Sequence, residues 1–258
     1  SSLGNQGAVA LDQRDYDTAT ARCAEQERVA RQFGDATLVN RALANQAQVL
    51  ADRGDPDAAL TLLARQEHEC RLCGDWAGLA ANLVSRASVL LFQGRYPEAE
   101  AAAVEGGELG RRLSSDSTLA RTLFLRATIA HQRGDRTTAV ALLDEHRPLA
   151  EALGDRSGLA LALGERATLA REDADPAAAL VLHAQEERLY AELGDRSGVA
   201  TSLSNQALAQ HALGDAAGAA ALLAKAEAII RDLDLPAMLQ VTLGNRGAFL
   251  LQAGDVAG

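Results

Sequence analysis

Apolar side chains recur along this chain at intervals of three and four residues, and short Gly-Asp pairs separate the segments in which they do so. In residues 36–52 the apolar positions Val39, Leu43, Ala47 and Leu50 are spaced by four, four and three residues. This spacing places them on one face of a helix about 25 Å long. The pattern therefore predicts an amphipathic helix over this segment.

The next segment, residues 57–73, shows the same spacing and predicts a second helix. The residues that we expect on its inner face are Ala59, Leu62, Leu63, Cys70 and Cys73. The two helices then recur every forty residues without insertion or deletion. One position of this cycle always holds Leu and another always holds Ala: Leu3, Leu43, Leu83, Leu123, Leu163, Leu203 and Leu243; Ala19, Ala59, Ala99, Ala139, Ala179 and Ala219.

A fixed period of this length is typical of a solenoid, in which each repeat buries its apolar face against its neighbours. We predict an all-α chain of antiparallel helix pairs, helix A then helix B, with about six and a half repeats. The whole of residues 1–258 is expected to form a single solenoid. Because it begins and stops partway through a repeat, we expect it to be an excerpt of a longer array.

Glycine and aspartate mark the ends of the predicted helices. Glycine supplies the left-handed backbone that ends a helix, and the aspartate after it caps the next helix. The expected capping residues are Asp15, Asp35, Asp55, Asp75, Asp135, Asp155, Asp175, Asp195, Asp215 and Asp255.

The pattern resembles the tetratricopeptide repeat superfamily, in its longer variant of roughly forty residues as found in sensor arrays of STAND-type signalling proteins. One repeat shows the resemblance through Leu203, Ala207, Gly214, Asp215 and Ala219. The small residues allow helices A and B to approach closely. The resemblance implies a right-handed superhelix with a concave groove that the A helices line.

One departure from that family is a polar residue just before the small residue of helix A: Gln6, Gln46, Arg86, Arg126, Arg166, Gln206 and Arg246. Four of them have a glutamate twenty-one residues later, in the pairs Gln6 with Glu27, Gln46 with Glu67, Arg166 with Glu187 and Gln206 with Glu227. We predict a hydrogen bond between the two helices of one repeat. Arg86 and Arg126 lack this glutamate, so the third and fourth repeats are expected to differ in shape or partner.

The exposed side of the A helices is the predicted functional face. In peptide-binding members of the resembling family, asparagines at the position of Asn5, Asn45, Asn205 and Asn245 bond to the backbone of an extended peptide, which an amide can do because it both donates and accepts. The candidate binding residues are Asn5, Asn45, Gln48, Arg121, His131, Arg171, Asn205, His211 and Asn245. A solvated polar face without a ligand is the alternative interpretation.

Charge narrows the choice of partner. The net charge of −10 argues against binding of nucleic acid by this segment, whereas Arg41, Arg121 and Arg171 favour an acidic, extended peptide or protein. No apolar stretch is long enough for a membrane span. Three cysteines are too few for a disulfide framework, so we expect a cytoplasmic protein.

Catalytic chemistry finds little support, and we expect neither an enzyme nor a cofactor. Cys70 and Cys73 occupy positions that another repeat gives to Ala150 and Leu153, so we interpret them as core residues rather than zinc ligands. His183 likewise stands where other repeats have leucine, and we expect it to be packed.

Two functions remain. The first is an interaction module, the sensor or scaffold arm of a larger signalling protein, whose groove binds a partner or missing domains of its own chain. The second is a regulatory receptor in which a small peptide changes the superhelix and switches an attached effector.

Overall fold

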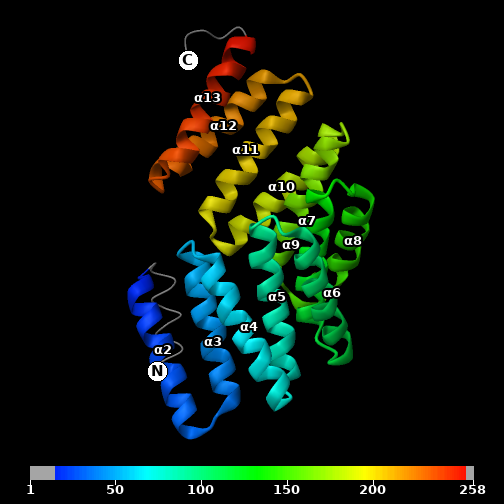
Figure 1. Cartoon of the computed structure of the whole chain (residues 1–258). Coiled ribbons are helices and arrows are strands. Elements are labelled where there is room, and N and C mark those ends of the chain that lie inside the picture. Colours follow the sequence, from blue (N-terminus) through cyan, green and yellow to red (C-terminus); the bar gives the residue numbers. More distant parts are fainter. Residues whose placement is uncertain (1–14, 254–258) are drawn as a thin grey trace. The chain divides into compact units, whose positions relative to one another are not determined.

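The computed structural model describes residues 15–253, and every element in that range is an α-helix, as the periodicity predicts. The described helices are α2 (Tyr16–Phe33), α3 (Ala36–Asp52), α4 (Pro56–Cys73), α5 (Trp76–Phe92), α6 (Tyr96–Arg112), α7 (Asp116–Gln132), α8 (Arg136–Leu153), α9 (Arg156–Glu172), α10 (Pro176–Leu193), α11 (Arg196–Ala212), α12 (Ala216–Asp232) and α13 (Pro236–Ala253) (Figure 1). The first predicted helix and Asn5 lie outside the described residues.

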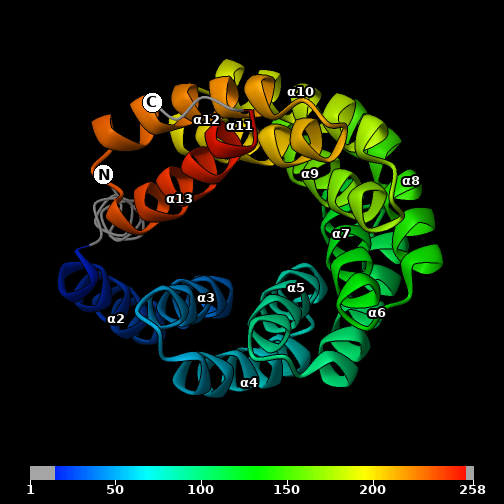
Figure 2. The ribbon, with the colours of Figure 1, turned by 90° about the horizontal axis from the view of Figure 1, so that it is seen from above.

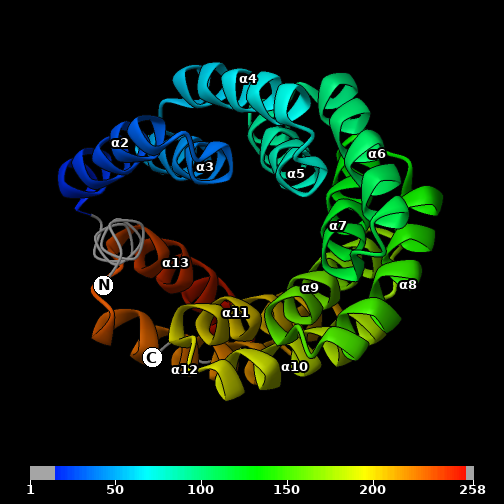
Figure 3. The same cartoon turned by 90° about the horizontal axis from the view of Figure 1, so that it is seen from below.

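The chain divides into two compact units, which we call unit 1 (Ser1–Asp135) and unit 2 (Arg136–Gly258). The described helices of unit 1 are α2 to α7, and those of unit 2 are α8 to α13. In each unit the odd-numbered helices, which are the predicted A helices, form one layer and the even-numbered B helices form the other (Figures 2 and 3). The fold is an all-α repeat solenoid built from consecutive helix pairs.

The aspartates cap the helices as the sequence predicts. The side chains of Asp15, Asp35, Asp55, Asp75, Asp155, Asp175, Asp195 and Asp215 each accept a hydrogen bond from the backbone N–H three residues later, at 2.8 to 3.1 Å. Each bond pairs an N–H group that the helix itself leaves open. Ser115 does the same for α7, whereas the Arg95 side chain makes no capping bond to α6.

The alanine position of the cycle lies where helices cross. Ala19, Ala59, Ala99, Ala139, Ala179 and Ala219 are all fully buried. Ala59 packs with Ala47 and Leu63 in one cluster, so the small side chains let α3 and α4 come close together. This arrangement confirms the predicted role of the alanine.

The expectation that Cys70 and Cys73 both lie in the core is half wrong. Cys70 is fully buried, but Cys73 is exposed. Cys73 is the last residue of α4, and the left-handed Gly74 follows it, so its side chain lies beyond the packed turns of the helix. Phe33 and Leu153 end their helices at the same position of the cycle and are exposed as well.

The turns after the helices require a left-handed backbone. Gly214 has a φ of 90°, and a Cβ added there would meet no atom within 4 Å. A side chain at this position would therefore meet strain from the backbone alone. Ser114, Ala174 and Asp234 also have positive φ angles, although their side chains disfavour this conformation.

We predict that Gly214→Ala lowers the free energy of unfolding by about 1 kcal/mol, because alanine resists the left-handed conformation. The matched control is Gly244→Ala, which lies inside α13 and also has open space around its Cβ position. There alanine should raise the free energy of unfolding by roughly 0.5–1 kcal/mol, through its better helix propensity. Urea unfolding of both variants measures the effects, and a shift of the same sign in both would refute this account of the turns.

Candidate functional site

The predicted binding residues that the structure describes all lie on the odd-numbered helices. Gln48, Arg121 and Arg171 are exposed, and the other five are half-buried: Asn45, His131, Asn205, His211 and Asn245. They belong to α3, α7, α9, α11 and α13.

Two of these residues, Gln48 and Arg121, come together in unit 1. They line a groove of about 270 Å³ between α3, α5 and α7, together with Ser85, Ser88 and the largely exposed ring of Phe92. The amide of Gln48 donates to Asp52 at 2.8 Å. Within residues 15–253, the Arg121 guanidinium has no hydrogen-bond or ion-pair partner. The groove thus combines amide, hydroxyl, cationic and aromatic groups that a peptide can contact.

The predicted residues of unit 2 are more dispersed. Asn205 and Asn245 hold the same position of the cycle on α11 and α13, and Arg171 is near the end of α9. His211 is already engaged, because its ring stacks on Phe249 with centroids 4.1 Å apart and contacts the Gln252 side chain.

The predicted hydrogen bond within a repeat is wrong, because each glutamate binds the following helix pair instead. The acceptor on an even-numbered helix bonds to the polar residue nineteen positions later, on the next odd-numbered helix. The four bonds are Gln46 to Glu27 at 2.7 Å, Arg86 to Glu67 at 2.8 Å, Gln206 to Glu187 at 2.6 Å and Arg246 to Glu227 at 2.7 Å. We call this contact the glutamate clamp.

Helix geometry explains the error. Ala47 packs on Ala59 and Leu63 of α4. Its neighbour Gln46 is turned by about 100° around the helix axis and so faces the preceding helix α2. Sequence spacing alone could not distinguish the two directions.

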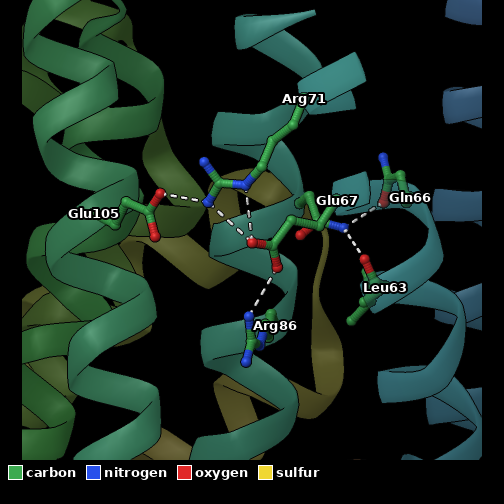
Figure 4. A network of polar contacts seen from close by, with 7 residues as sticks. Leu63, Gln66, Glu67, Arg71, Arg86 and Glu105 are labelled. Carbon is green, nitrogen blue, oxygen red and sulfur yellow. Dashed lines mark hydrogen bonds and ion pairs between the residues drawn. The ribbon is translucent and has the colours of Figure 1, made fainter. Parts of the chain in front are cut away.

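Figure 4 shows the clamp at Glu67. Its carboxylate accepts from Arg86 of α5 at 2.8 Å and from Arg71 of its own helix at 2.9 Å, and Arg71 reaches Glu105 of α6 at 2.6 Å. Beside it, the buried Asn82 amide donates to Gln66. One carboxylate thus connects α4 to α5 and, through Arg71, to α6.

At the Glu227 clamp, the neighbouring arginines lower the pKa of the carboxylate. At Glu227 the hydrogen bond from Arg231 lowers the pKa below its ordinary value, against the opposing effect of burial and with help from Arg246. The carboxylate is therefore charged at neutral pH, and its bonds are charge-assisted.

We call the contact between an even-numbered helix and the odd-numbered helix after it a junction. Two of the described junctions lack the clamp. Gly107 and Arg147 stand where the other described helices have glutamate, opposite Arg126 and Arg166. Arg126 pairs with Glu100 at 2.8 Å instead, and Arg166 reaches Asp144 at 3.7 Å. The sequence did indicate irregular middle repeats, but it placed one of them at Arg86, which has a regular clamp.

The sequence analysis missed a larger groove of about 910 Å³ in unit 2, between α8, α9 and α10. Arg147, Arg166 and Val181 are among its lining residues. Arg147 is the signal that could have revealed this groove. Together with Arg166 it puts two cations at the positions where the clamped junctions have a glutamate and its donor.

Cys70 and His183, two residues that could carry out reactive chemistry, are both buried. Burial raises the pKa of the Cys70 thiol to about 12, so it stays protonated and unreactive. His183 is buried as expected, with Nδ1 2.7 Å from the Glu186 carboxylate. Residues 15–253 hold no group of side chains that could bind a metal ion, and none of their helices is long and apolar enough to cross a membrane.

A double-mutant cycle tests the direction of the clamp. We predict that Glu67→Ala and Arg86→Ala show a coupling energy of roughly 0.5–2 kcal/mol in urea unfolding. The exposed pair Glu25 and Arg28, on one helix, is the control and should couple by less than about 0.5 kcal/mol. Equal coupling in both pairs would contradict the role of the clamp.

Comparison with known proteins supports the fold. A family model described as tetratricopeptide repeat matches residues 40–65, 83–105, 120–145 and 200–225. The STAND protein with a tetratricopeptide repeat sensor from Pyrococcus horikoshii is 12% identical, with a TM-score of 0.80 over 98% of this chain and 39% of that chain. The apo quorum sensor NprR from B. thuringiensis is 12% identical, with a TM-score of 0.78 over 95% of this chain and 69% of that chain.

BtubC (BKLC) from P. vanneervenii is 17% identical, with a TM-score of 0.71 over 91% of this chain and 93% of that chain. A search of curated proteins finds no match. The family model recognises four of the helix pairs, and the forty-residue cycle of leucine, alanine and capped turns continues through the others. The family model thus identifies tetratricopeptide repeats in four segments of the chain, and the likeness to the solved structures shows the same all-α repeat fold.

Proposed function

We propose that this chain is a non-catalytic interaction module that binds an extended, acidic peptide or protein segment on its odd-numbered helices. The tetratricopeptide repeat fold is generally an interaction scaffold. The observation that carries the proposal is the groove of unit 1, where the unpaired guanidinium of Arg121 lies beside Gln48 and the exposed ring of Phe92. A carboxylate bound by Arg121 would form a charge-assisted bond, which is stronger than a neutral one.

Within unit 2, Asn205 and Asn245 are further proposed contacts, because they repeat an amide on successive odd-numbered helices. Arg171 adds a further cation, and it has no ion pair within residues 15–253. The proposed partner therefore offers backbone amide groups to the asparagines and acidic side chains to the arginines. We further propose that the module serves a larger cytoplasmic signalling protein, as its likeness to a STAND sensor and to a quorum sensor suggests.

A regulatory receptor is the second proposal, and the same likeness to sensors favours it. It differs from a passive module in one respect, since ligand binding must change the conformation. Small-angle scattering with and without bound peptide separates the two: compaction supports the receptor, and an unchanged radius of gyration supports the passive module.

Peptide binding tests the proposed face. The probes are fluorescein-labelled extended octapeptides rich in Asp and Glu, with matched peptides in which Asn and Gln replace the acids. We predict that fluorescence anisotropy detects saturable binding of the acidic set. Arg121→Ala with Gln48→Ala, or Asn205→Ala with Asn245→Ala and Arg171→Ala, should weaken binding by roughly ten-fold while leaving Tm nearly unchanged.

The control is Lys225→Ala on α12, which removes an exposed cation from the other layer. Binding that survives both sets of changes but is lost in the control would place the site on the even-numbered helices. Equal binding of the acidic and amide peptides would contradict the proposed role of the arginines.

A further inference from the structure

The groove of about 910 Å³ in unit 2 is elongated and has helical walls. Its longest wall is α10, whose lining residues run from Asp175 to Glu192 at intervals of three and four. Seventeen residues of helix span about 25 Å, so the groove follows almost the whole of α10. The opposite wall is α8, and α9 lies between them.

The missing clamp explains why the groove is open. Arg147 and Arg166 occupy the two clamp positions and both line the groove, so this junction has no carboxylate at the clamp position to join the helices. Arg147 turns to Glu151 on its own helix at 2.8 Å, and α8 packs less extensively on α9 than the other described even-numbered helices pack on the helix that follows.

The floor of the groove is apolar. Leu163, Leu182 and Leu189 are half-buried, and Val181 is 57% exposed. At the position of Val181 the other cycles have a small or polar residue: Ala21, Thr61, Ala101, Ala141 and Ala221. This groove is therefore the place where that position carries a larger apolar side chain.

The rim of the groove carries the carboxylates Asp144, Glu151, Asp175 and Glu192, each of which already has an ion pair or a capping hydrogen bond within the chain. The arginines of the rim are less fully paired. The Arg188 guanidinium has no hydrogen-bond or ion-pair partner in the described part of the chain, because Gln185 stands where the first cycle has Glu25, which pairs with Arg28. Arg166 has only the 3.7 Å contact to Asp144. Two arginines are thus available to a carboxylate beside an apolar floor.

We propose that this groove binds an amphipathic α-helix of a partner protein. Leucine-like side chains of that helix occupy the floor, and its acidic side chains pair with Arg166 and Arg188, supplying the carboxylate that glutamate supplies at other junctions. The groove follows almost the whole of α10, so it is long enough for about five turns of a partner helix, which presents apolar anchors along one face. The groove is lined by residues other than those of the proposed peptide face, so either proposal can fail without the other.

Selection from a helix library tests the proposal. The probe is a displayed library of sixteen-residue helices with fixed leucines at positions i, i+3, i+7 and i+10, in which the other positions vary among Glu, Lys, Gln and Ser. Selected on the full chain, it should enrich clones with glutamates beside the leucine stripe. Val181→Asp should abolish enrichment, whereas Val241→Asp, at a 64% exposed position on α13, should leave it intact. No enrichment, enrichment of lysine clones, or equal enrichment on both variants would overturn the proposal.

A charge swap with the strongest clone tests the pairing. Arg188→Glu should weaken binding of the glutamate peptide by roughly ten-fold, and a peptide with Lys in place of its glutamates should recover binding to that variant. Loss without recovery would show that Arg188 contributes no ion pair and would contradict the proposed contact.

Restoring the clamp tests why the groove is open. Arg147→Glu should bond to Arg166 as Glu67 bonds to Arg86, which should raise Tm and abolish peptide binding. Unchanged binding would contradict the link between the clamp and the groove. Two further measurements test other occupants of the groove. If the chain self-associates and Val181→Asp makes it monomeric, the occupant is a second copy of the chain. If only dodecanoate displaces the peptide, the groove is a site for a small amphiphile, and either result would overturn the proposed partner helix.

Discussion

The contact between each even-numbered helix and the odd-numbered helix after it is the constraint on which the structure depends. In a solenoid each repeat touches only its neighbours, so the junction decides how one repeat follows the next. At four junctions among the helices of residues 15–253, a partly buried glutamate holds this contact through a charge-assisted bond to Gln46, Arg86, Gln206 or Arg246. A partly buried carboxylate needs such partners, since leaving it unpaired would cost more free energy than the bond contributes.

Where the glutamate is absent, the junctions differ in the way that the remaining side chains allow. At Gly107 the helices come close, and a Cβ added there would lie 3.1 Å from the Thr122 hydroxyl, so small size replaces the clamp. At Arg147 the side chain is large and of the wrong charge, and the junction leaves a groove beside Arg166. The residue at one position of the cycle thus decides the kind of junction: glutamate gives a clamp, Gly107 gives close packing and Arg147 leaves a groove. Variation at a single structural position gives a repeat protein distinct surfaces on a constant fold.

The sequence predicts much of this fold because the same pattern of leucine, alanine and capping residues recurs in every cycle. The helices, the caps such as Asp55 and Asp215, and the buried alanines follow from periodicity and local chemistry. The direction of the clamp could not be predicted, because a polar residue between two helices can face either of them, and only packing of Ala47 shows which. Exposure of Cys73 was missed because its helix ends at that residue. The large groove depends on three helices together, and its one signal in the sequence is Arg147 at a position where glutamate is expected.

Rotation of arginine guanidinium groups, measured by NMR on the Nε–Cζ bond, tests the clamp most directly. We predict slow rotation for Arg86, with release to the rate of an exposed arginine such as Arg188 when Glu67 is replaced by Gln. Arg166 should keep its rate when Glu187 is replaced by Gln, because that glutamate bonds to Gln206 instead. Free rotation of Arg86 in the unmodified chain, or release of Arg166 in the Glu187→Gln variant, would contradict the account.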